Sequence, residues 1–88
     1  MTQYLVTRTL PPLNEEQLQA VGKKVVEVCE QMENVSWVRS NLSADGKHSF
    51  CILEAPNAEA CIEHARLAGL PVDQVVPLGL EIGPNMFK

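Results

Sequence analysis

The hydrophobic pattern first follows the period of a strand and then that of a helix. Gln3–Thr9 alternates over a run rich in β-branched and aromatic residues, which predicts a strand. The strand ends at Pro11-Pro12, because neither proline can donate a hydrogen bond to a neighbouring strand. Over Glu15–Glu33 the apolar residues recur at helical spacing, and Asn14 and Gln17 fit the N-terminus of this predicted helix as an approximate capping box.

Two further strands are predicted on either side of a tight turn. Val35–Leu42 and Lys47–Ala55 are joined by a segment containing Asp45-Gly46, a strong hairpin signal, so the two strands are expected to pair antiparallel. In the first of them, strict alternation puts Trp37 and Arg39 on one face and Ser36, Val38 and Ser40 on the other. In the second it puts His48, Phe50, Ile52 and Glu54 on one face and Ser49, Cys51 and Leu53 on the other.

A second helix and a last strand complete the pattern. Pro56 stops the preceding strand, Asn57 fits the helix N-cap, and Gly69 fits the left-handed position that closes a helix. The apolar stripe of this helix consists of Ala58, Cys61, Ile62, Ala65 and Ala68, with His64 at its edge. Val75–Ile82 is an apolar run that predicts the last strand, and the tail Gly83–Lys88 is expected to be loose.

The predicted order is therefore strand, helix, strand, strand, helix, strand, which is typical of the ferredoxin-like α+β fold. Right-handed crossovers place both helices on one face of a four-stranded antiparallel sheet. The other face then has no cover within the chain, and a monomer rarely leaves such an apolar patch open. We expect a homodimer that packs sheet to sheet as a dimeric α/β-barrel-like assembly, with a cavity between the sheets.

Length and composition limit the classes of protein to which the chain can belong. The 88 residues make one domain, 1–88, and the net charge of −4 argues against general nucleic-acid binding. No secretory signal is evident, and no apolar run approaches the roughly 20 residues that span a bilayer. Three widely spaced cysteines do not form a disulfide pattern, so a reducing cytoplasm fits best.

The residues that could bind a metal gather in the second half of the chain. Cys61 and His64 are three positions apart on the second predicted helix, a spacing that suits zinc, nickel or copper, although both also fit a packed core. Glu54 stands at a strand end, either as a site residue or as a solvated carboxylate, and on the opposite face from Cys51. His48 fits a solvent-facing histidine at the hairpin.

A second set of residues could bind an organic molecule instead. Tyr4, Arg8, Trp37 and Arg39 are the candidates to line a cavity on the open face of the sheet. The two aromatic residues fit equally well as anchors of a dimer interface. The chain shows no Ser-His-Asp set, no phosphate-binding glycine loop, no Cys-x-x-Cys pair and no evident acidic pair for general acid–base catalysis.

Several motifs resemble a family of short ferredoxin-like domains of unknown function, whose best-described type is a nickel-binding protein. They are W-V-R-S (Trp37–Ser40), C-I-L-E-A-P (Cys51–Pro56) and E-H-A-R-L-A-G-L-P-V-D-Q-V (Glu63–Val75), with Y-L-V-T-R-T-L-P (Tyr4–Pro11) near the start and I-G-P (Ile82–Pro84) near the end. The resemblance implies a βαββαβ fold, a homodimer with facing sheets and binding of a divalent metal. Among the residues of these motifs, the hypothesis of metal binding is placed on His64 first, and then on Glu54 and Cys51. Cys29 and Cys61 are assigned to the core.

The leading prediction is a small cytoplasmic homodimer that binds nickel or another divalent transition metal and has no catalytic activity of its own. The alternative is a cofactor-free enzyme of the dimeric α/β-barrel kind, a monooxygenase or isomerase acting on a small organic molecule. A metal site requires donors that converge at an accessible helix edge. A closed apolar cavity that contains Arg39, Trp37 or Tyr4 would favour the organic ligand.

Overall fold

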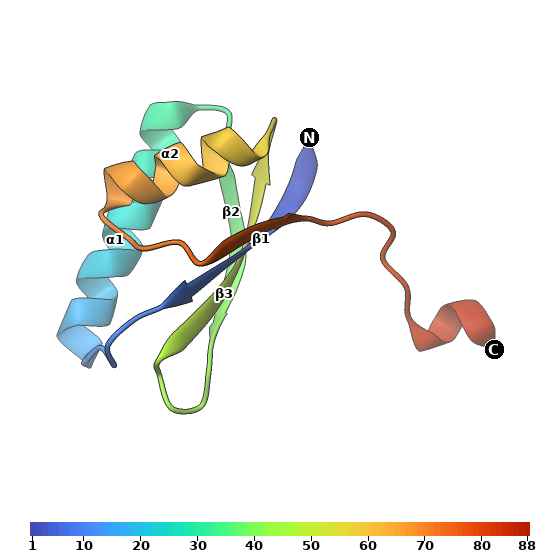
Figure 1. Cartoon of the computed structure of the whole chain (residues 1–88), viewed down its shortest axis with the longest axis horizontal. Coiled ribbons are helices and arrows are strands. Elements are labelled where there is room, and N and C mark those ends of the chain that lie inside the picture. Colours follow the sequence, from blue (N-terminus) through green and yellow to red (C-terminus); the bar gives the residue numbers. More distant parts are fainter.

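A computed structural model describes the whole chain, Met1–Lys88, and has the predicted order of elements. The elements are β1 (Thr2–Thr9), α1 (Glu15–Met32), β2 (Ser36–Leu42), β3 (His48–Ala55), α2 (Ala58–Ala68), β4 (Gln74–Pro77) and a short 3-10 helix, η1 (Pro84–Phe87). Figure 1 shows both α-helices on one side of the sheet and the C-terminal segment leaving on the other. The bounds of β1, α1, β2, β3 and α2 agree with the predicted ones to within about one residue.

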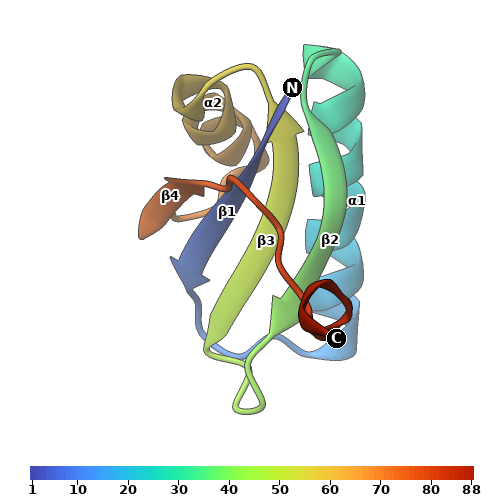
Figure 2. The same ribbon diagram turned by 90° about the vertical axis from the view of Figure 1, so that its right-hand side faces the viewer.

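The four strands form one antiparallel sheet in the order β2-β3-β1-β4. This is the ferredoxin-like α+β arrangement, so the predicted fold is confirmed. The view in Figure 2 looks onto the helix-free side and shows β2, β3 and β1 next to one another, with α1 and α2 behind them. The sheet of one chain ends in the edge strands β2 and β4, so a single chain does not support the α/β-barrel interpretation.

The core lies between the sheet and α2. Its buried side chains come from alternate positions of β1 and β3 and from α2: Tyr4, Val6, Leu53, Ala55 and Cys61, together with Val35 before β2. Small residues on α2 let this helix approach the sheet closely. In contrast, the α1 backbone comes close to α2 and, within the sheet, only to the edge strand β2, while its side chains Cys29 and Met32 pack against the core.

The helix ends follow the sequence signals. The Asn14 side chain accepts a hydrogen bond from the Gln17 backbone, and the Gln17 side chain accepts one from the Asn14 backbone, which completes the capping box of α1. The Asn57 side chain accepts a hydrogen bond from the Ala60 backbone at the start of α2. Gly69 closes α2 with a φ of 72°, a left-handed conformation that glycine adopts without strain.

A β-bulge in β2 changes the predicted faces of this strand. Trp37 pairs with Leu53, but the next paired residue, Arg39, stands opposite Ile52, so Val38 is an extra residue. Trp37 therefore shares the helix-facing side with Ser40, to which its Nε1–H donates a hydrogen bond of 2.8 Å. The predicted grouping of Trp37 with Arg39 was wrong, because strict alternation does not hold across a bulge.

The last strand is shorter than predicted. Instead of Val75–Ile82, β4 spans only Gln74–Pro77, and a final backbone bond joins the Leu78 N–H to the Gln3 carbonyl oxygen. Proline cannot continue the hydrogen-bond ladder, and the chain leaves the sheet at this point. Residues 78–88, here called the C-terminal arm, then extend away from the sheet with exposed apolar side chains.

Neither α-helix combines the length and apolarity that crossing a bilayer would require.

Replacing Asn57 by Ala should lower the free energy of unfolding by about 1 kcal/mol, because the first turn of α2 loses its side-chain cap. Asn85→Ala in the exposed C-terminal arm is the matched control and should leave stability nearly unchanged. Urea denaturation followed by circular dichroism measures both. Equal stability of the two variants would show that the cap does not stabilise α2.

Candidate functional site

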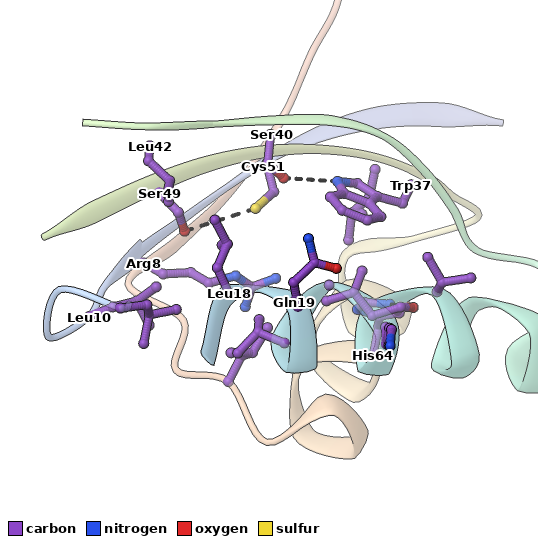
Figure 3. A pocket seen from close by; sticks show the side chains of 18 residues that line it. Arg8, Leu10, Leu18, Gln19, Trp37, Ser40, Leu42, Ser49, Cys51 and His64 are labelled. Atoms are coloured by element: carbon purple, nitrogen blue, oxygen red, sulfur yellow. Dashed lines mark hydrogen bonds between the residues drawn. The ribbon is translucent and has the colours of Figure 1, made fainter. Parts of the chain in front are cut away.

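The distance between α1 and the middle of the sheet leaves a cavity of about 520 Å³ between them. Leu18, Val21 and Val25 of α1 form one wall, and Trp37 and Leu53 of the sheet form the opposite wall. Figure 3 shows the two walls with Arg8, Gln19, Ser40 and Ser49 between them and His64 in the helix layer. A cavity of this volume with mainly apolar walls lies within the range of small-molecule sites in proteins.

Arg8 is the buried charged residue of this cavity. Its side chain leaves β1 on the helix-facing side and is only 2% exposed. One guanidinium nitrogen, Nη1, donates a hydrogen bond of 2.8 Å to the Pro71 carbonyl oxygen, while Nε has no partner. The two ion pairs of the chain, Lys24–Glu27 and Glu63–Arg66, both lie elsewhere. Arg8 is therefore a buried cation without a carboxylate partner, which is costly to maintain.

Other polar groups of the sheet lie near Arg8. Ser49, the residue opposite Arg8 in the β1–β3 register, is buried and its Oγ lies 3.9 Å from the Cys51 sulfur. Ser40 accepts the hydrogen bond from Trp37. Arg8, Ser49, Cys51 and Ser40 all belong to the cavity lining, which contains no aspartate or glutamate. The lining thus offers hydrogen-bond donors and positive charge but no carboxylate for acid–base catalysis.

His64 lies at the contact between α1 and α2 and is fully buried. Its Nε2 is 3.3 Å from the Cys29 sulfur and 3.3 Å from the Val25 carbonyl oxygen, while Nδ1 has no partner. The buried face of α2 therefore includes His64, whereas Ile62, which the predicted stripe contained, is 52% exposed. The prediction that His64 lies at the edge of the stripe was wrong, because α1 packs directly onto that side of α2.

Burial also sets the protonation state of this region. Burial lowers the pKa of the His64 imidazole below its ordinary value of 6.5, and the nearby Arg8 charge lowers it further. Burial raises the pKa of the Cys29 thiol and of the Cys61 thiol. Neutral pH therefore favours a neutral imidazole beside a protonated thiol, whereas a metal ligand or nucleophile would need the thiolate.

The three predicted metal ligands do not form one cluster. His64, buried at the contact between the helices, and Cys51 of β3 both line the helix-facing cavity, whereas Glu54 lies on the opposite side of β3. No group of three or more His, Cys, Asp or Glu side chains is arranged to hold a metal ion. The donors of one chain therefore do not fit a nickel site, which needs several imidazole, carboxylate or thiolate ligands. The metal-binding role of the three residues stays a prediction.

The predicted cavity residues divide between the two faces of the sheet. Arg8 and Trp37 do line a cavity, but it is the one on the helix-facing side and not on the open face. Tyr4 also points to the helix-facing side and is buried in the core, while Arg39 lies exposed on the open face. The sequence did not predict that α1 contributes to the cavity or that Cys29 contacts His64. Both features depend on distances between elements that are far apart in the chain.

Acidification should destabilise the protein through His64. The folded-state pKa of His64 is depressed, so below pH 6.5 the unfolded chain binds more protons than the folded chain. The resulting stability is complete above pH 6.5 and is lost as the pH falls below it, by at most about 1.4 kcal/mol per pH unit. Urea titrations between pH 7.5 and 5.5 should show this loss in the wild type and in His48→Gln, which changes the exposed histidine. His64→Gln should show a smaller loss, and an equal loss in all three proteins would contradict the assignment.

Comparison with known proteins places these observations in a family. The sequence profile of the nickel responsive protein SCO4226-like family matches residues 4–78. The crystal structure of SCO4226 from Streptomyces coelicolor A3(2) superposes with a TM-score of 0.79 at 21% identity, covering 91% of this chain and 99% of that chain. At this identity the superposition supports the shared fold alone. No curated protein sequence matches the chain. Because the family profile covers most of the domain, the chain belongs to the SCO4226-like family of nickel responsive proteins.

Proposed function

We propose that the chain acts as a nickel-responsive homodimer in which two copies pack through the helix-free faces of their sheets. Family membership supports the response to nickel. The single observation that carries the homodimer is the apolar surface on the face of the sheet that neither helix covers.

This surface follows from the strand register. Ile52 of β3 and Val76 of β4 both stand opposite Leu5 of β1, so the three apolar side chains form one row across the sheet. Phe50, two residues before Ile52 in β3, is 43% exposed beside this row. α1 and α2 occupy the other side of the sheet. Val76 is exposed, and Leu5 and Ile52 are half-buried with no helix over them. Contiguous apolar patches of this kind mark protein interfaces in small soluble domains.

The C-terminal arm adds apolar surface on the same side. It leaves the sheet after Pro77 and extends away from the helices, as Figures 1 and 2 show. Its exposed large side chains are Leu78, Leu80, Ile82, Met86 and Phe87. An arm with this composition has nothing to cover within its own chain, so a second copy is the simplest partner for it. Except for Leu78, where the match to the family profile ends, the arm lies outside the matched residues.

The nickel response fits a dimer better than a single chain. One chain brings no three donors together, so further ligands would have to come from a second copy. The helix-free face carries His48 and Glu54, whose imidazole and carboxylate groups suit nickel. Two copies packed through this face would offer twice as many donors. We therefore expect nickel binding to depend on dimerisation and on Glu54.

A cofactor-free enzyme acting on a small organic molecule is the second candidate, and the cavity on the helix-facing side is what favours it. A neutral His64 is its best candidate for a base. The cavity lies within one chain, however, so this activity would not need the sheet-to-sheet dimer.

Ile52→Glu should break the dimer, since it places a charge within the apolar row on the central strand β3. We expect the dimer dissociation constant to rise by about 100-fold or more, as for a central interface residue. Ile62→Glu makes the same change at an exposed position on α2 and should leave the dimer intact. Sedimentation equilibrium at micromolar concentration measures both variants, with circular dichroism to verify the fold. A wild-type protein that stays monomeric there would refute the proposed dimer.

Calorimetric titration with nickel chloride tests the metal part of the proposal. Wild type should bind nickel. Glu54→Gln should bind it at least about tenfold more weakly, because a charge-assisted contact contributes roughly 1.5–3 kcal/mol. Ile52→Glu should weaken nickel binding to a similar extent, because it breaks the dimer on which binding depends. His64→Ala should retain wild-type affinity because His64 is enclosed between the helices. Loss of binding in His64→Ala with unchanged binding in Glu54→Gln would place the metal beside Cys29 and contradict the dimer-face site.

A further inference from the structure

We propose that the cavity between α1 and the sheet binds an amphipathic organic carboxylate, with the carboxylate on Arg8 and the apolar part along α1. This site lies on the opposite side of the sheet from the proposed dimer interface. It is therefore independent of the nickel-responsive homodimer.

The charge distribution is the first argument. The chain has 11 acidic and 7 basic residues and a net charge of −4. Yet the cavity lining contains Arg8 and Lys23 and not one acidic residue. A positive cavity in an acidic protein favours an anion over a cation or a neutral ligand.

The state of Arg8 is the second and independent argument. A guanidinium that is 2% exposed would normally have a carboxylate partner, but Arg8 donates only to the Pro71 carbonyl oxygen and its Nε remains unpaired. Figure 3 shows the Arg8 side chain extending into the cavity, below Ser49. The planar guanidinium matches a carboxylate, because two parallel N–H groups can meet its two oxygens. A bound carboxylate would supply the charge partner that the chain itself lacks.

The walls of the cavity define the rest of the ligand. Leu18 and Val26 of α1 and Trp37 and Leu42 of β2 are large apolar side chains that remain 38–45% exposed although they line the cavity. A hydrocarbon or aromatic group placed between them would remove this surface from water, which is favourable by roughly 25 cal/mol per Å². A single anionic head on a single apolar body therefore fits better than a polar metabolite or a polyanion such as a nucleotide.

The buried hydroxyl of Ser49 is a further donor on the Arg8 side of the cavity. It stands opposite Arg8 in the strand register, so both groups are held by the rigid centre of the sheet. The polar end of the site is thus preorganised, while the apolar wall on α1 belongs to a helix whose backbone approaches that of the sheet only at β2.

The fluorescence of Trp37 gives a direct measurement of ligand binding, since Trp37 is the only tryptophan of the chain and lies in the cavity wall. Titration of the wild type with sodium octanoate should change the tryptophan fluorescence saturably. Octan-1-ol carries the same alkyl chain without the charge and should bind at least about tenfold more weakly, as expected for loss of a charge-assisted contact. Acetate, which keeps the charge without the chain, should also bind more weakly than octanoate. These comparisons need no variant.

Arg8→Met tests the role of the positive charge in ligand binding, because methionine keeps an unbranched side chain and removes the charge. It should weaken octanoate binding at least about tenfold and leave octan-1-ol binding unchanged. Without ligand the variant should unfold at the same or a higher temperature than the wild type, because an unpaired buried charge has been removed. Arg39→Met, on the opposite face of the sheet, is the control and should bind octanoate like the wild type.

Three results would each overturn the proposal. The first is the absence of saturable octanoate binding to the wild type up to millimolar concentration. The second is octan-1-ol binding as tightly as octanoate. The third is a folded Arg8→Met variant with wild-type affinity for octanoate, which would show that the positive charge of Arg8 does not select the ligand.

Discussion

The cavity depends on the packing of α1 against α2, since α1 forms one of its walls, and His64 is buried at this contact. The imidazole occupies the space between α1 and α2, within 3.3 Å of both the Cys29 sulfur and the Val25 carbonyl oxygen. α1 lies against α2 and its backbone approaches that of the sheet only at β2. The cavity lies between α1 and the strands, with Arg8 and His64 in its lining.

The sheet separates two surfaces that have different chemical character. On the helix-facing side the strands contribute Arg8, Ser49 and Trp37 to a positive cavity without carboxylates. On the helix-free side the same strands contribute the row of Ile52, Leu5 and Val76. Because neighbouring residues of a strand point to opposite sides, each strand can serve both surfaces without competition between them. A bound anion and a second copy of the chain could therefore be present together.

Much of the fold could be predicted because it depends on local chemistry. The caps at Asn14, Asn57 and Gly69 act within one helical turn, and the hairpin at Asp45-Gly46 acts within a few residues. The candidate site was less accessible to sequence reasoning. Arg8 was assigned to a cavity, but on the wrong side, because alternation shows which residues share a face and not which face the helices cover. The bulge at Val38 was missed because no proline or glycine marks it.

The sequence by itself determined the order of the elements, most of their bounds and the family, since periodicity, caps and short motifs are properties of neighbouring residues. Only the tertiary structure decided that His64 is enclosed with a lowered pKa, that it and Cys51 line one cavity on the side of the sheet opposite Glu54, and that Arg8 is buried without an acidic partner. These properties depend on distances between elements far apart in the chain. The packing of α1 on α2 and the pairing of the strands set those distances, and no local pattern encodes them.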